Sequence, residues 1–203
     1  MEGLAVVEVG ASKTSVNRMV GRYDVTPTDV LGRVYALALR VGGNRLDADE
    51  AFIATAVLLS LRGTCPRARV GCVLVDAKGY ILATGYNGVP RGQSHCLDVP
   101  CPGAADRPGE RELCEATHAE ANALLRCGNV ERVATCYVTR APCPPCVRLL
   151  LNTACKRVVF LEVHSRVEEA RALWLGKHHR LIKPQELWAG YQGSERRWER
   201  FER

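Results

Sequence analysis

The amino-acid sequence predicts an α/β domain in which helices cover a mixed β-sheet. Between residues 47 and 86 a helix pattern precedes a strand–turn–strand pattern, and between residues 112 and 175 helix and strand patterns alternate. Elements that alternate in this way form layered α/β domains. The 203 residues, of which 47% are hydrophobic and 25% charged, suffice for one such domain with extensions.

The first half of this domain reads as a helix followed by a hairpin. Residues 47–61 form an amphipathic helix pattern, in which Asp47 can cap the first turn and Glu50 lies three residues on, as in a capping box. Residues 70–76 and 80–86 then form two strand patterns joined by a glycine-containing turn.

The second half begins after a long loop and returns to regular patterns. Residues 87–111 are rich in glycine, proline and cysteine, so this loop should be functional or held in place by something else. The alternating elements that we predict beyond it are helix 112–126, strand 134–139, helix 144–152, strand 157–161 and helix 167–175.

Two segments lie outside the predicted domain, to which we assign residues 47–185. Residues 1–46 form an N-terminal extension with one helix candidate at 28–40, and its residues suggest no chemistry. Residues 186–203 form a basic tail that also carries aromatic side chains.

The charge and hydropathy of the chain exclude some classes of protein. The longest apolar run, residues 53–61, is about half of what spans a bilayer, and the first residues lack a secretory pattern, so we expect a cytoplasmic protein without a membrane partner. The net charge of +6 suits an anionic small molecule or a nucleic acid. In a reducing compartment, ten cysteines indicate metal ligands or buried thiols rather than disulfides.

Three residues with zinc-binding side chains lie near predicted helix starts. His118 is near one start, and Cys143 and Cys146 flank the next. A spacing of three places both sulfurs on one face, and the helix dipole favours the thiolate that zinc needs. Three protein ligands leave the fourth position open for water, whose pKa zinc lowers to about 7.

Glu120 is placed for a different role. Two residues beyond His118 on a helix it points elsewhere, towards water and substrate, where a carboxylate serves as a proton shuttle. His-x-Glu or Cys-x-x-Cys alone is common, and the latter can belong to a structural zinc site. Together they form the His-x-Glu and Pro-Cys-x-x-Cys signature of zinc deaminases, so we predict a catalytic zinc with Glu120 beside it.

From about residue 49 to residue 161 the chain resembles the deoxycytidylate (dCMP) deaminases of the bacterial and phage type, within the cytidine deaminase superfamily. The motifs that carry this resemblance are TCPR at 64–67, VGCVLV at 70–75, ATGYNG at 83–88, HAEANA at 118–123, YVT at 137–139 and PCPPC at 142–146. The resemblance implies a three-layer α/β/α fold with a five-stranded mixed sheet, and hydrolytic deamination of dCMP to dUMP and ammonia. It also implies activation by dCTP and inhibition by dTTP with Mg, and a homo-oligomer, often a hexamer.

The resemblance also implies residues that hold the nucleotide. Gly85, Tyr86 and Asn87 belong to the motif that contacts it, although Asn-Gly is also a common turn dipeptide. Arg67 matches a phosphate-contacting arginine, and His95 on the long loop could reach the substrate or a zinc ion. Further cations whose roles stay open are Arg69, Arg91 and Arg140; the last could bind phosphate or face solvent.

The remaining cysteines divide into two sets. Family members close to this chain carry a structural zinc, for which the resemblance implies the ligands Cys65, Cys96, Cys101 and Cys114; the alternative is four unrelated thiols. The other set, which we expect in the core, is Cys72, Cys127, Cys136 and Cys155.

Two alternatives to a nucleotide deaminase stay open. A deaminase of single-stranded DNA or tRNA could use the basic tail, whose stacking faces are Trp188, Tyr191, Trp198 and Phe201. The residues before Pro142 are Arg140 and Ala141, where many other deaminases have a glutamate, and this disfavours a tRNA substrate. A non-enzymatic module would have no use for Glu120, so its presence argues for catalysis.

Overall fold

The computed structural model describes residues 46–104, 113–163, 165–174 and 177–181, which belong to one compact unit within Arg40–Arg203. The helix expected at 28–40, nearly all of the N-terminal extension and the whole basic tail lie outside the described residues. None of the helices in the described ranges has the length and hydropathy that crossing a lipid bilayer requires.

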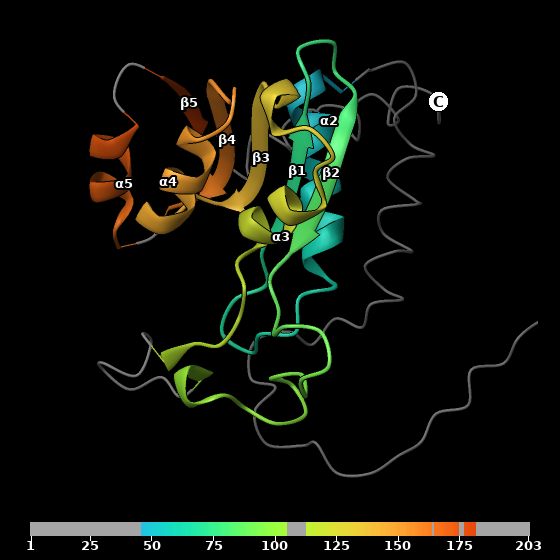
Figure 1. Cartoon of the computed structure of the whole chain (residues 1–203), viewed down its shortest axis with the longest axis vertical. Helices are drawn as coiled ribbons and strands as arrows, with labels where there is room; N and C mark the ends of the chain where they lie inside the picture. The colour runs from blue at the N-terminus through green and yellow to red at the C-terminus, as the bar shows by residue number, and fades with distance from the viewer. Residues whose placement is uncertain (1–45, 105–112, 164, 175–176, 182–203) are drawn as a thin grey trace, which may run out of the picture. The chain divides into compact units, whose positions relative to one another are not determined.

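The five strands form one mixed sheet (Figure 1). Their order is β2-β1-β3-β4-β5; β1 is antiparallel to β2 and β3, and β4 is parallel to β3 and β5. The strands are β1 Gly71–Val75, β2 Ile81–Tyr86, β3 Thr135–Arg140, β4 Arg157–Glu162 and β5 His178–Leu181, and the helices are α2 Ala48–Ser60, α3 Ala119–Arg126, α4 Pro144–Leu151 and α5 Val167–Leu173.

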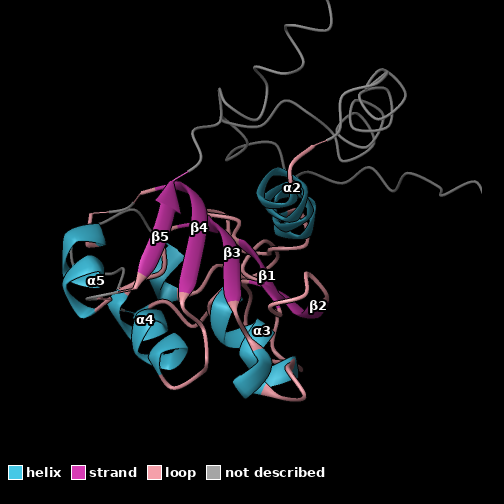
Figure 2. Cartoon of the chain, turned by 90° about the horizontal axis from the view of Figure 1, so that it is seen from above, coloured by secondary structure: helices cyan, strands magenta, loops and turns pink. Residues whose placement is uncertain are grey.

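Helices cover both faces of this sheet, as Figure 2 shows: α2 lies on one side, and α3, α4 and α5 lie on the other. Successive side chains of a strand point to opposite faces. In β1, Val73 and Val75 pack against α2, whereas Cys72 and Leu74 belong to the larger core on the other face. The predicted three-layer α/β fold with a five-stranded mixed sheet is therefore confirmed.

The predicted capping box at the start of α2 is confirmed. The backbone N–H of Glu50 donates to Asp47 Oδ1 at 2.7 Å, and the backbone N–H of Asp47 donates to Glu50 Oε2 at 2.8 Å. These reciprocal bonds satisfy two donors that a helix start leaves unpaired.

A buried ion-pair network holds α2 to the sheet. Asp49 is 7% exposed and accepts hydrogen bonds from the Tyr137 hydroxyl at 2.8 Å and from Arg157 Nη1 at 2.6 Å. A third bond, from Arg180 Nη1 on β5, is 2.5 Å long. The Arg157 guanidinium is the main reason that the pKa of Asp49 is lowered to about 2.

Most predicted boundaries lie within two residues of those in the structure, and two elements differ by more. The helix predicted at 112–126 begins only at Ala119, because Thr117 forms a β-bridge with Gly88 through backbone hydrogen bonds of 3.1 and 2.9 Å. The strand His178–Leu181 was not predicted at all, because the sequence HHRL shows no strand-like alternation of apolar residues.

Candidate active site

His118 and Cys143 occupy the same structural position in two neighbouring elements: each is the N-cap of its helix. Both have an extended backbone, and neither side chain caps its own helix, so both are available for another partner. Pro144 and Pro145 follow Cys143 in the first turn of α4, where a missing N–H costs nothing. The chain thus delivers both side chains to one place.

The side chains of His118, Cys143 and Cys146 converge there. His118 Nδ1 lies 3.3 Å from Cys143 Sγ and 3.4 Å from Cys146 Sγ. Zinc–nitrogen and zinc–sulfur bonds of usual length, set at a tetrahedral angle, would separate such atoms by about 3.6 Å. Across the described ranges, no other three His, Cys, Asp or Glu side chains gather as closely. The three residues therefore fit the predicted catalytic zinc.

The surroundings favour the thiolate form of Cys143, which is the form that binds a metal. Hydrogen bonding from Cys146 and then from His118 lowers the pKa of Cys143 to about 4, whereas the pKa of Cys146 is raised, first by its bond to Cys143. The pKa of His118 is raised, mainly through its hydrogen bond with Cys143.

Glu120 lies next to this cluster, one residue into α3. Its side chain is only 3% exposed, and burial is the largest cause that raises its pKa. The nearby His118 charge and a hydrogen bond with Cys146 oppose that rise in part. A buried carboxyl group that holds a proton more readily than usual is suited to passing protons to and from a bound molecule.

A cavity of about 810 Å³, which includes space open to solvent, joins these residues. Glu120 and His118 line the cavity together with Arg67 and Arg140. Two guanidinium groups beside one buried carboxyl group suit an anionic ligand.

Two of the expected substrate residues, Asn87 and Arg67, line this cavity, and their side chains also form hydrogen bonds with backbone groups of the protein. Asn87 Oδ1 accepts from the Val70 N–H at 2.7 Å, and Asn87 Nδ2 donates to the Ala68 carbonyl at 2.8 Å. Arg67 donates to the carbonyl of Gly103. One amide N–H of Asn87 and one lone pair of its carbonyl remain for a ligand, so its predicted role stays a prediction.

The other three expected substrate residues do not line the cavity. A Cβ on Gly85 would come within 2.5 Å of the Ala123 nitrogen, so this glycine serves the close approach of α3 to β2. The ring of Tyr86 lies 5.8 Å from the guanidinium groups of both Arg62 and Arg126. His95 is exposed on the loop. The predicted contacts of Gly85, Tyr86 and His95 with the substrate stay predictions.

The four cysteines of the expected structural zinc site lie near one another without forming a ligand group. Cys65, Cys96 and Cys101 are buried, and Cys65 and Cys101 each raise the pKa of Cys114 further after burial has raised it. No three of their sulfurs lie within 4.8 Å of one another, in contrast to the catalytic set. The second zinc stays a prediction.

Of the cysteines expected in the core, three are fully buried. Cys72 and Cys136 lie with their sulfurs 3.6 Å apart, and burial raises the pKa of Cys155 to about 12. Cys127 is only half-buried and packs against the edge of this core. The pKa values of Cys72 and Cys136 are raised as well, and raised pKa values are typical of inert structural thiols.

Among the polar residues of the cavity wall, Ser165 had no signal in our sequence analysis. Ser165 follows β4 and lines the cavity beside Arg140 of the parallel strand β3. Ligands commonly bind at the carboxyl ends of parallel strands, so the strand order, once known, would have indicated Ser165.

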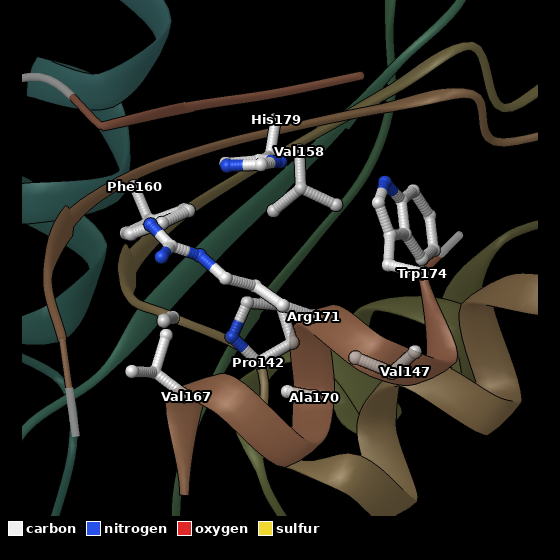
Figure 3. A pocket seen from close by; sticks show the side chains of 10 residues that line it. Pro142, Val147, Val158, Phe160, Val167, Ala170, Arg171, Trp174 and His179 are labelled. Carbon is white, nitrogen blue, oxygen red and sulfur yellow. The ribbon is translucent and has the colours of Figure 1, made fainter. Parts of the chain in front are cut away.

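A second, apolar cavity has walls formed by α4, α5 and β4, and Figure 3 shows side chains that line it. Pro142, Val147, Phe160 and Trp174 line it, and Ala141 belongs to both cavities. This cavity adjoins the backbone that carries Cys143, so packing there supports the position of the ligand.

The fold and the site define a zinc-dependent deaminase of the three-layer α/β/α type. The model of the cytidine and deoxycytidylate deaminase zinc-binding region matches residues 46–162, and the chain belongs to that family. It is 40% identical over 124 residues to the deoxycytidylate deaminase of Mycobacterium phage D29, which covers 58% of this chain and 96% of the relative. The deoxycytidylate deaminase of Saccharomyces cerevisiae is 36% identical over 125 residues, covering 60% of this chain but only 40% of the yeast protein.

A solved structure supports the same assignment. The apo crystal structure of dCMP deaminase from the cyanophage S-TIM5 matches with a TM-score of 0.52 and 25% sequence identity. The match covers 68% of this chain and 100% of the cyanophage chain.

Proposed function

We propose that the chain hydrolyses dCMP to dUMP and ammonia. One observation carries this proposal. His118 and Cys143, which form the ligand set together with Cys146, line a cavity with Glu120, and two arginines line the same cavity. The relatives named deoxycytidylate deaminase support the choice of substrate. An arginine fork suits the phosphate that distinguishes dCMP from deoxycytidine.

The chain's own residues supply the proton transfers. When bound, zinc supplies Lewis-acid activation of the water that attacks C4 of the cytosine ring. Glu120 accepts a proton from this water and delivers it to N3 as the new C4–O bond forms. Glu120 then takes the proton from the new hydroxyl group on C4 and passes it to the amino group. The C4–N bond breaks as the C4 carbonyl forms, and ammonia leaves.

Regulation and assembly are part of the same proposal. We expect activation by dCTP and inhibition by dTTP with Mg, a cytoplasmic location, and a homo-oligomer such as a hexamer. Exposed apolar side chains on adjacent helices support self-association: Leu125 of α3 is 81% exposed and Leu149 of α4 is 45% exposed. Light scattering on the purified chain measures the oligomer directly.

Ammonia release by the zinc-loaded protein tests the substrate class. The substrates are dCMP, deoxycytidine and single-stranded DNA, each with and without dCTP. We expect turnover of dCMP, faster with dCTP, and little turnover of the other two. Activity on DNA but not on dCMP would overturn the proposal and favour a polynucleotide deaminase that uses the basic tail.

A further inference from the structure

We infer that Arg140 binds the 5′-phosphate of the substrate and makes the site prefer a nucleotide over a nucleoside. This inference rests on the proposed deaminase function and adds a specificity-determining residue to it. Arg140 is the last residue of β3 and lines the same cavity as Glu120 and His118. It therefore lies three residues before the zinc ligand Cys143.

The backbone fixes the direction of the Arg140 side chain. Cys136 and Val138 of β3 belong to the core beneath α3 and α4, and Arg140 follows them in the alternating pattern of the strand. Arg140 pairs in register with Glu162 of β4, and the next N–H, that of Ala141, donates to the Glu162 carbonyl at 2.7 Å. The strand end is thus held firmly against its neighbour, and the side chain is delivered to the catalytic face.

The Arg140 guanidinium carries an unused donor. Its Nε is buried, yet it has no hydrogen-bond partner in the described part of the chain. A buried donor without a partner destabilises the folded state, so such atoms in native proteins call for a specific explanation. A ligand that enters the cavity would supply the missing acceptor.

The other arginine on the wall is placed differently. Arg67 is largely exposed, and it already donates to the Gly103 carbonyl. Arg140 is half-buried and is not an ion-pair partner of any residue in the described ranges. Arg140 is therefore the deeper and less committed cation of the two.

A phosphate monoester matches these properties. A guanidinium group donates two parallel hydrogen bonds to phosphate oxygens, and these charge-assisted bonds are stronger than neutral ones. Glu120 lines the same cavity, and in the proposed mechanism its carboxyl group contacts the cytosine ring rather than the phosphate. A nucleotide can thus present its base to Glu120 and its phosphate to Arg140 within one cavity.

Substrate pairs that differ only in the phosphate test this inference. The zinc-loaded proteins are wild type, Arg140→Ala, Arg140→Lys and the control Arg91→Ala, which changes an exposed arginine outside the cavity wall. We measure kcat/KM for dCMP and for deoxycytidine. Arg140→Ala should lower kcat/KM for dCMP by about 10- to 100-fold and leave deoxycytidine unchanged.

The lysine variant separates a binding role from a structural one. Arg140→Lys keeps the charge but not the fork, so it should recover part of the dCMP preference, mainly through KM. A loss that is equal for both substrates, or no loss for either, would overturn the inference. Zinc content and melting temperature must match wild type in the variants compared.

Binding of the product keeps this test independent of turnover. The zinc-loaded wild type should bind dUMP more tightly than deoxyuridine, and Arg140→Ala should remove that difference. Absence of ammonia release from dCMP by wild type would refute the proposed function, whereas an unchanged preference for dUMP in Arg140→Ala would refute the role of Arg140.

Discussion

The two faces of the sheet use buried polar groups in opposite ways. Beneath α2, the carboxylate of Asp49 meets Tyr137, Arg157 and Arg180. On the face covered by α3, α4 and α5, Glu120 and the Nε of Arg140 are buried beside a cavity. Paired polar groups such as Asp49 stabilise the fold, whereas a buried donor without a partner, such as Arg140 Nε, is available to a ligand. The first face serves stability and the second serves chemistry.

Removing a ligand from the catalytic face should have the largest effect. Cys143→Ala should lose both the zinc and all ammonia release, because the Cys143 sulfur lies 3.3 Å from His118 Nδ1 in the ligand set. Metal analysis and an ammonia assay measure the two losses. Cys72→Ala is the matched control, since it removes a buried thiol on the same face and should keep the metal. Full zinc content in Cys143→Ala would contradict this assignment.

Changing the proton carrier should separate chemistry from metal binding. Glu120→Gln keeps the shape of a fully buried side chain but cannot transfer the proton, so turnover should fall by about 10²- to 10⁴-fold with zinc retained. The same metal and ammonia assays check it. Zinc loss equal to that of Cys143→Ala would mean that Glu120 has no separate role.

On the opposite face, Asp49→Asn should change stability and spare turnover. The substitution leaves Arg157 without a carboxylate partner and leaves Arg180 with only Asp47, at 3.8 Å. Because both guanidinium groups are partly exposed, we expect a loss of about 2 kcal/mol in the free energy of unfolding, between the values for exposed and buried pairs. Urea denaturation measures the loss, with the exposed Asp98→Asn as control. A change below about 1 kcal/mol, the value of an exposed pair, would contradict the structural role.

The same residue predicts a pH dependence of stability. The pKa of Asp49 is lowered to about 2 in the folded state, below its ordinary value near 4. Its stabilisation is therefore complete above pH 4 and is lost as the pH falls through 2. This contributes about 2 kcal/mol in wild type and nothing in Asp49→Asn. Urea denaturation of both proteins between pH 2 and pH 5 measures this difference. If the free energy of unfolding changed with pH equally in wild type and in Asp49→Asn, the assignment would be contradicted.

The smallest effect concerns Tyr86, which the sequence places with the substrate and the structure places between Arg62 and Arg126. Tyr86→Leu should lower the free energy of unfolding by about 1 kcal/mol through lost cation–π contacts and should leave KM for dCMP unchanged. Steady-state kinetics and urea denaturation measure both quantities. A raised KM with unchanged stability would return Tyr86 to the nucleotide site.

Short-range patterns predicted which residues the structure brings together at the candidate site, because their motifs are local in sequence. His118 with Glu120, and Cys143 with Cys146, each lie within one turn of a helix start, where spacing determines geometry. The α/β fold followed for the same reason, from the periodicity of each element and the resemblance. The boundary of α3 was wrong, because the Gly88–Thr117 bridge links residues far apart in the chain.

Long-range pairings could not be predicted in this way. Asp49 and Arg157 are 108 positions apart, and no local pattern joins them. The role of Gly85 depends on the position of α3, since a glycine permits close approach of a helix as readily as of a ligand. For Arg140 the sequence left two orientations open, and only the packed strand end selects between them.

The most direct test of the division between a stabilising face and a catalytic face measures the stability of a catalytic-face variant and the turnover of a variant on the opposite face. We would measure the melting temperature of zinc-loaded Glu120→Gln and the turnover of dCMP per folded molecule of Asp49→Asn. The account predicts a melting temperature for Glu120→Gln no lower than wild type, and wild-type turnover for Asp49→Asn. A strongly lowered melting temperature in the first, or lost turnover in the second, would contradict it.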